Sequence, residues 1–266
     1  AWNVVWGRGR AGVVVEGGYA EVSGASLHAG DGSAIHVDGR FALRFPRADG
    51  REIDARVRVA RRTVADFRTA FGLYDYPVEG RLSGEFHLTG RYAGPHGFGR
   101  LIIEEGSAWG EPFERGTASL RFEGAGVRLD GLTIEKGGGT ITGAAYVGWD
   151  GTYSFDADGR RIPVERIASL ALPRAPLSGL LAFTASGSGT FESPRYEVRA
   201  RVADLFAGDE GVGQVTLRLR VRGCGLCGSD IAKIADAGTK PPAVFGHEVV
   251  GEVIEVGPGV AGFAPG

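Results

Sequence analysis

The sequence predicts a mostly β protein, built as an elongated, repetitive antiparallel sheet with a few short helices. Apolar and polar residues alternate with a period of two from about residue 11 to about residue 220, which places one apolar row on one face of each strand. Glycine accounts for 46 of the 266 residues and is spread between these runs rather than gathered in a linker. A similar order of motifs also occurs twice, which is typical of repeat proteins.

The composition excludes several classes of protein. A formal net charge of −2 does not provide the basic face that binds phosphates, so we expect no nucleic-acid partner. Two cysteines are too few for a multi-disulfide framework, and no apolar run reaches the roughly 18 residues of a membrane-spanning helix. The chain contains no methionine and stops in Gly262-Phe-Ala-Pro-Gly266 without a closing element, so we expect a fragment of a longer protein.

The alternating runs predict strands joined by glycine turns. Apolar residues alternate with other residues in 35–45, where Gly39 takes one apolar position, and in 53–59 and 118–122, and two further alternating pairs follow at Val127 and Leu129 and at Leu132 and Ile134. Glycine adopts a positive φ without steric cost, so Asp-Gly and Gly-Gly pairs predict tight turns. We expect such turns at Asp38-Gly39, Asp49-Gly50, Asp130-Gly131, Gly137-Gly138-Gly139 and Asp156-Ala-Asp158-Gly159.

Two short stretches break the alternation and predict helices. Val64, Phe67 and Phe71 are spaced so that they share one helical face. A briefer helix is expected to start after Pro163, with the same face formed by Val164, Ile167 and Leu170.

The repeat is visible in two pairs of matching segments. Leu82-Ser83-Gly84 returns 95 residues later as Leu177-Ser178-Gly179, and Leu120-Arg121-Phe122 returns 97 residues later as Leu217-Arg218-Leu219. The unit is therefore a short helix, a Leu-Ser-Gly turn and several meandering strands. Units of this kind stack on their neighbours. The pattern changes near 217–223, so we expect one domain over residues 1–219 and a second over 220–266.

The first segment resembles the AsmA-like family and its translocation and assembly module (TamB) branch. The resemblance rests on Pro77-Val-Glu-Gly-Arg-Leu-Ser-Gly84, Ala175-Pro-Leu-Ser-Gly179, Glu192-Ser-Pro-Arg-Tyr196 and Gly137-Gly-Gly-Thr-Ile-Thr-Gly143. It implies a β-sheet curled into a groove with an apolar inner face, held by an inner-membrane anchor in the periplasm. It also implies phospholipid acyl chains or the outer-membrane protein assembly machinery as partners. The residues alone leave open that the apolar row is the core of a closed sandwich or barrel.

The last 46 residues resemble the start of the zinc-containing medium-chain alcohol dehydrogenases, whose catalytic domain is GroES-like. Three blocks carry the resemblance and occur in the family's order: Cys224-Gly-Leu-Cys-Gly-Ser-Asp230, Gly246-His-Glu248 and Gly251-Glu-Val-Ile-Glu-Val-Gly-Pro-Gly259. The resemblance implies an incomplete GroES-like β-barrel after the repetitive sheet. It also implies a cytoplasmic oxidoreductase for this segment.

The resemblance assigns roles to individual residues of the second segment. Cys227 and His247 would be zinc ligands, and Glu248 a close or alternative ligand. Ser229 would be the catalytic residue that relays the alcohol proton, and Asp230 would orient the imidazole. Thiolate and imidazole are ligands that suit Zn²⁺.

The resemblance also shows what these residues lack. The family's further zinc ligand and its NAD(P)-binding domain would lie beyond Gly266, so NAD(P) is expected only if the chain continues, and this fragment should not catalyse a reaction by itself. Cys224 and Cys227 leave a second interpretation open, a redox pair or a disulfide.

The two segments point to different compartments. The segment Leu217-Arg-Leu-Arg-Val-Arg-Gly223 continues the repeat strand and also leads into the dehydrogenase-like motif. A join within such a shared segment is expected from an assembly or recombination artefact. We therefore expect an envelope lipid-transport or assembly fragment joined to the start of a dehydrogenase. Two other interpretations remain: the first part of a zinc- and NAD(P)-dependent oxidoreductase, or a β-repeat scaffold without enzymatic activity.

Overall fold

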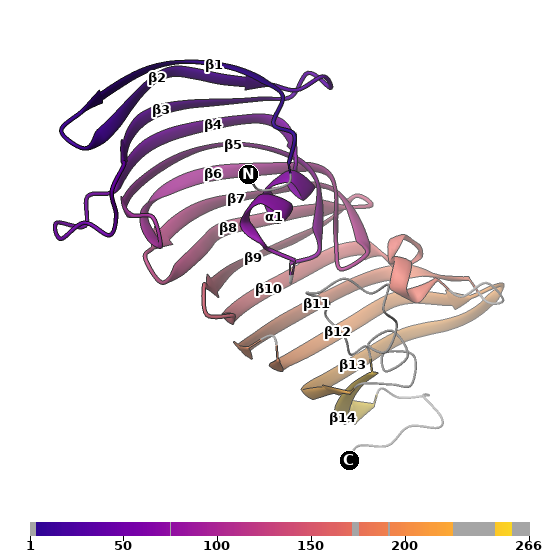
Figure 1. Cartoon of the computed structure of the whole chain (residues 1–266). Helices are drawn as coiled ribbons and strands as arrows, with labels where there is room; N and C mark the ends of the chain where they lie inside the picture. Colours follow the sequence, from indigo (N-terminus) through magenta and orange to yellow (C-terminus); the bar gives the residue numbers. More distant parts are fainter. Residues whose placement is uncertain (1–3, 75, 172–175, 191, 226–247, 257–266) are drawn as a thin grey trace, which may run out of the picture.

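In the computed structural model, the described residues form one antiparallel sheet of fourteen strands (Figure 1). The structure describes residues 4–74, 76–171, 176–190, 192–225 and 248–256. The strands lie in the sheet in the order in which they occur in the sequence, so each pairs with its sequence neighbours. The predicted mostly β, antiparallel fold class is confirmed.

The first half of the sheet contains one α-helix. Its elements are β1 (Arg8–Glu16), β2 (Tyr19–His28), β3 (Ala34–Ala42), β4 (Ile53–Thr63), α1 (Val64–Phe71), β5 (Val78–Arg91), β6 (Gly94–Ala108) and β7 (Glu111–Glu123).

The second half contains two short 3₁₀ helices. Its elements are β8 (Gly126–Lys136), β9 (Gly139–Gly148), β10 (Thr152–Pro163), η1 (Val164–Arg166), η2 (Ala168–Leu170), β11 (Leu177–Thr190), β12 (Ser193–Ala207), β13 (Glu210–Gly225) and β14 (Glu248–Val256).

The sheet is curved but not closed. β1 and β14 lie at its two ends and do not pair with each other, so the closed sandwich or barrel left open by the sequence is wrong for the described residues. Shifts of register interrupt most strand pairs, for example between Val59 and Arg62 in β4 and between Gly159 and Ile162 in β10. Such bulges bend a strand locally, and Figure 1 shows the strands arching across the sheet.

The two faces of the sheet differ in polarity. Pairing between neighbouring strands aligns one apolar row from β2 to β12, interrupted only by glycine: Ala25, Val37, Val57, Phe86, Gly99, Leu120, Leu129, Ala145, Phe155, Gly187 and Tyr196. We call the side of the sheet that carries this row the apolar face. Residues on either side of each of these positions belong to the opposite, polar face, where charged side chains pair across strands, as Arg58 and Glu85 do at 2.7 Å.

Many glycines lie inside strands, where they receive aromatic rings from the neighbouring strand. A Cβ atom on Gly187 would lie 2.6 Å from Cε1 of Phe155, and one on Gly99 would lie 2.5 Å from Cδ1 of Phe86. The rings therefore lie close to the backbone of the next strand. This packing, and not turns alone, explains the abundance of glycine.

The predicted helix at residues 64–71 is confirmed, and a buried arginine ties it to the start of the chain. Thr63 caps α1 at its first turn, and Gly72 ends it with a φ of 67°. Arg62 is 2% exposed; it donates hydrogen bonds to the Val5 carbonyl at 2.9 Å and the Trp6 carbonyl at 3.3 Å, and its Nε lies 2.6 Å from Asp66. One side chain therefore joins β4, α1 and residues 5–6.

The repeat is present in the structure, but its offset is 99 residues. β11 and β12 have the same lengths as β5 and β6, and the pair Gly90–Pro95 returns as Gly189–Pro194. The offsets of 95 and 97 inferred from the sequence are therefore wrong by four and two residues. The two Leu-Ser-Gly segments lie within strands and form no turn.

Other predicted turns are also corrected. Asp38-Gly39 lies inside β3, Asp156–Gly159 lies inside β10, and Asp130-Gly131 forms a bulge within β8. An Asp-Gly pair has the same local conformational freedom in a bulge as in a turn, so sequence alone does not separate them. The turns at Asp49-Gly50 and Gly137-Gly138 are confirmed. The second predicted helix is two 3₁₀ helices, η1 and η2.

We expect Arg62→Ala to destabilise the protein by about 3 kcal/mol, because it removes several hydrogen bonds and leaves Asp66 without its partner. Urea unfolding followed by circular dichroism measures this loss. Arg56→Ala, at an exposed position on the same strand, should change the unfolding free energy by less than about 0.5 kcal/mol. Equal effects of the two changes would contradict this role for Arg62.

Candidate functional site

Most of the predicted dehydrogenase site lies outside the described residues. This applies to Cys227, Ser229, His247 and Asp230. Glu248 is the first residue of β14, and its backbone pairs with Gly225, the last residue of β13. The structure therefore tests the surroundings of this site but not its predicted ligands.

β13 pairs with β14 at the point where the two segments that carry the predicted ligands begin. Cys224 pairs with Val249, and Gly225 pairs with Glu248, at the end of the strand pair. In the sequence, Cys227 follows Gly225 by two residues and His247 directly precedes Glu248. The two motif segments thus leave and enter the sheet at neighbouring points, which agrees with a GroES-like fragment. The predicted boundary between residues 219 and 220 falls inside β13 and stays a prediction.

The described residues contain no other candidate metal centre. In that part of the chain no three His, Cys, Asp or Glu side chains form a group that could hold a metal ion. Within the same residues, no helix has the length and apolar character needed to cross a membrane.

The carboxylate of Glu111, at one rim of the sheet, contacts both η2 and the end of β8. The Glu111 carboxylate accepts hydrogen bonds from the N–H groups of Ala168 at 3.0 Å and Ser169 at 2.7 Å, and lies 3.2 Å from Nζ of Lys136. Burial opposes its ionisation, but the hydrogen bonds from Ser169, Ala168 and Lys136 outweigh burial and hold the pKa of Glu111 at about 2. Glu111 therefore fixes η2 against the start of β7.

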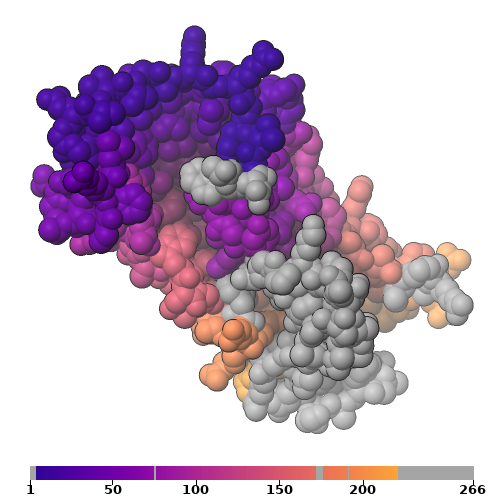
Figure 2. Space-filling model, in the orientation of Figure 1, coloured from indigo at the N-terminus to yellow at the C-terminus, as the bar shows by residue number. Residues whose placement is uncertain are grey.

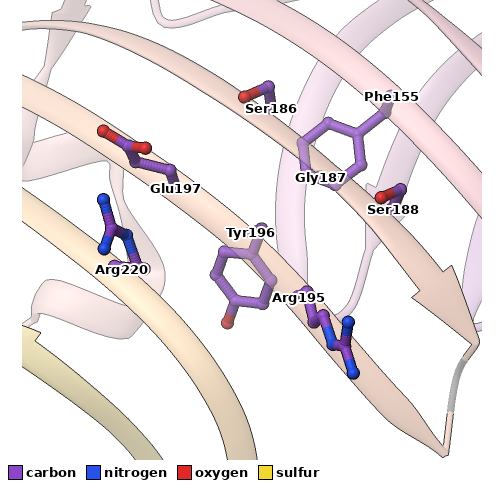
Figure 3. Close-up of a pocket in the computed structure, with 8 residues that line it drawn as sticks. All are labelled: Phe155, Ser186, Gly187, Ser188, Arg195, Tyr196, Glu197 and Arg220. Carbon is purple, nitrogen blue, oxygen red and sulfur yellow. The ribbon is translucent and has the colours of Figure 1, made fainter.

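A cavity of about 690 Å³ lies over β10 to β13 (Figure 3). Figure 3 shows the Phe155 ring beside Gly187, and Glu197 and Arg220 on neighbouring strands. Hydrogen bonds from Arg218 and Arg199 lower the pKa of Glu197, the one carboxylate among the lining residues. The residues that line the cavity are Phe155, Ser186, Gly187, Ser188, Arg195, Tyr196, Glu197 and Arg220.

The apolar face has no covering layer over much of the described sheet. Val57, Phe86, Leu129 and Phe155 are each only half-buried. Apart from neighbouring strands, the described elements that pack extensively on a strand are α1, on β4 and β5, and the short η1 and η2. Figure 2 shows the surface recessed in the N-terminal half, beside α1. An extended apolar surface is therefore left partly accessible.

Sequence reasoning did not identify the Glu111 cluster or the cavity. The partners of Glu111 lie 57 and 58 residues away, and the cavity joins four strands, so both depend on the register of the sheet. Alternation within the strands did predict the apolar face.

The comparisons with known proteins concern the C-terminal part of the chain. Residues 201–266 match the model of the alcohol dehydrogenase GroES-like domain. The chain is 48% identical to an acryloyl-coenzyme A reductase of Metallosphaera sedula over 50 residues, 18% of this chain and 15% of the reductase. It is 36% identical to an L-threonine 3-dehydrogenase of Pyrococcus horikoshii over 72 residues, 25% and 20% of the two chains.

A plant enzyme gives the same result. A cinnamyl alcohol dehydrogenase of Capsicum annuum is 48% identical over 56 residues, 20% of this chain and 16% of the enzyme. The chain thus spans no more than about a fifth of the length of these relatives. No solved structure matches the chain. The C-terminal region is similar to the N-terminal region of zinc-dependent medium-chain dehydrogenases.

Glu111 should make the stability of the protein depend on pH. Its pKa in the folded protein lies below its ordinary value of 4.5, so its contribution is present above about pH 4.5 and is lost as the pH falls towards about 2. We expect Glu111→Gln to remove about 2 kcal/mol at pH 7 and to flatten the fall below pH 4.5. Urea unfolding at several pH values measures both effects. Glu135→Gln, at an exposed position in β8, should leave the fall unchanged. A fall that is as steep in Glu111→Gln as in the unchanged chain would contradict this assignment.

Proposed function

We propose that the C-terminal segment is the beginning of a zinc-dependent, GroES-like dehydrogenase domain. The match of residues 201–266 to that domain carries the proposal. It is supported by the pairing of Gly225 with Glu248, which starts both ligand-bearing segments at one edge. The substrate and the activity of the whole protein are part of this proposal, as an oxidoreductase acting on an alcohol or a carbonyl compound.

The donor set of the segment suits zinc. Cys227 offers a thiolate, His247 an imidazole and Glu248 a carboxylate, and these three groups are the usual protein ligands of Zn²⁺. When bound, zinc polarises the oxygen of the substrate as a Lewis acid. The Ser229 hydroxyl would pass the alcohol proton away from the site. NAD(P) is the expected hydride acceptor, and we assign no residue of this chain to it.

A zinc-binding experiment tests this proposal. The full chain, dialysed against buffer containing zinc and then against metal-free buffer, should retain one zinc ion by atomic absorption. Cys227→Ser and His247→Ala should each weaken zinc binding by more than about a hundredfold, because each removes a ligand. Cys224→Ser is the matched control and should retain the metal. Loss of zinc in Cys224→Ser with retention in His247→Ala would instead indicate a Cys-x-x-Cys site.

We also propose that the apolar face binds acyl chains. The half-buried row through Val57, Phe86 and Phe155 favours this second function, because a row this long usually packs against another layer. The curvature of the sheet would make this face the inner side of a groove. The resemblance of residues 1–219 to the AsmA-like family, with phospholipid or an outer-membrane assembly partner and a periplasmic location, belongs to this proposal.

A charge placed on the apolar face should disrupt this binding. We expect Phe86→Asp to weaken the binding of a fluorescent long-chain fatty acid about tenfold, measured by titration of the full chain, because a carboxylate would lie against the acyl chain. Phe98→Asp is the matched control, since Phe98 lies on the polar face of the adjacent strand and is 66% exposed. Equal affinities of the two variants would contradict binding at the apolar face.

A further inference from the structure

Five polar-face residues of β11, β12 and β13 line the cavity of about 690 Å³ (Figure 3). Ser186, Glu197 and Arg220 pair in one row across these three strands. Ser188 and Arg195 pair in the next row along the same face. The cavity therefore has two guanidinium groups and two hydroxyl groups in its lining, and its volume is in the range of sites for small organic molecules.

Two neighbouring arginines already neutralise the carboxylate in this lining. Oε1 of Glu197 accepts hydrogen bonds from Nη2 of Arg199 at 3.1 Å and from Nε of Arg218 at 3.0 Å. Arg199 and Arg218 pair directly across β12 and β13, where like charges repel each other, and Glu197 offsets this repulsion. The group of two arginines and one glutamate thus keeps an excess of positive charge.

The two arginines that line the cavity have no ionic partner. Among the residues that the structure describes, the side chains of Arg195 and Arg220 form no ion pair and no hydrogen bond. Asp156 of β10, which pairs with Ser186, is not part of the lining. This local excess of positive charge contrasts with the formal net charge of −2 of the whole chain. The cavity is therefore complementary to an anion.

We infer that this cavity binds a phosphate monoester. A guanidinium group forms paired hydrogen bonds with phosphate oxygens, and the hydroxyl groups of Ser186 and Ser188 donate further ones. A phosphate monoester carries about two negative charges at pH 7, which balance the charges of Arg195 and Arg220. The volume of the cavity leaves room for the organic group of the ester. A soluble glycerol phosphate and the headgroup of phosphatidic acid share this chemistry.

Titration calorimetry of the full chain with glycerol 3-phosphate tests the inference. Arg195→Gln and Arg220→Gln should each weaken binding about tenfold, because each removes charge-assisted hydrogen bonds to the phosphate. Arg201→Gln is the matched control, since Arg201 lies on the same face of β12, contacts Gln214 and does not line the cavity. Its affinity should stay within about twofold of the unchanged chain, because salt screens distant charges.

Glu197→Gln should change the affinity in the opposite direction. Loss of this carboxylate releases Arg199 and Arg218 for the ligand, so glycerol 3-phosphate should bind about tenfold more tightly. A variant that has lost its fold cannot bind more tightly, so this result separates an anion site from a purely structural role. Dimethyl phosphate, a diester with a single charge, should bind the unchanged chain at least about tenfold more weakly than glycerol 3-phosphate.

Vesicle flotation distinguishes the two sources of the phosphate. A chain that floats with phosphatidylcholine vesicles containing phosphatidic acid, but does not bind glycerol 3-phosphate, takes a lipid headgroup, and the same variants are then compared by flotation. Binding of glycerol 3-phosphate without flotation indicates a soluble ester. Binding to neither would overturn the inference, as would equal losses in Arg195→Gln and Arg201→Gln. Dimethyl phosphate binding as tightly as the monoester, or a Glu197→Gln variant that binds no more tightly than the unchanged chain, would also overturn it.

Discussion

Hydrogen bonding between strands adjacent in the sequence is the constraint on which the rest of the structure depends. In the described part of the chain no second sheet covers the first, so the backbone groups of each strand between β1 and β14 are satisfied by its two neighbours. Side chains are then buried only within one curved layer. Phe155 over Gly187 and Phe86 over Gly99 show the consequence, since aromatic rings lie against the backbone of the next strand instead of entering a second layer.

Because the sheet is held together by pairing between neighbouring strands, additional contacts are found where the chain passes from one strand to the next. Arg62 joins residues 5–6, β4 and α1, and Glu111 joins the start of β7 to η2. Both lie at the same rim, where chain segments between strands are long enough to form helices. The buried charges therefore stabilise the rim, while several residues of the apolar row, such as Phe86 and Phe155, remain half-buried. The ionic groups that stabilise the structure therefore lie at the rim, away from the surface that we propose to bind acyl chains.

Sequence patterns predict the strands, α1 and the apolar face, because these depend on residues close together in the chain. The spacing of Val64, Phe67 and Phe71 is sufficient for the helix. The predicted repeat offset was wrong because it aligned two segments of identical sequence, Leu82-Ser83-Gly84 and Leu177-Ser178-Gly179. In the structure, the equivalent positions are the paired residues Gly90–Pro95 and Gly189–Pro194. The partners of Glu111 and the cavity over β10 to β13 follow from register, which no local pattern specifies. The zinc ligands stay a prediction, which the resemblance of the last residues to a known family supplied.

β13 is the strand in which the two parts of the chain meet, since it pairs with β12 of the repeat and with β14 of the dehydrogenase-like segment. Hydrogen–deuterium exchange of the full chain tests this arrangement most directly. Our account predicts that amides of Leu217–Val221 are protected as strongly as those of Ser119–Glu123 in β7, because both stretches have a strand on each side. Fast exchange of alternate amides in β13, as in an edge strand, would contradict the account.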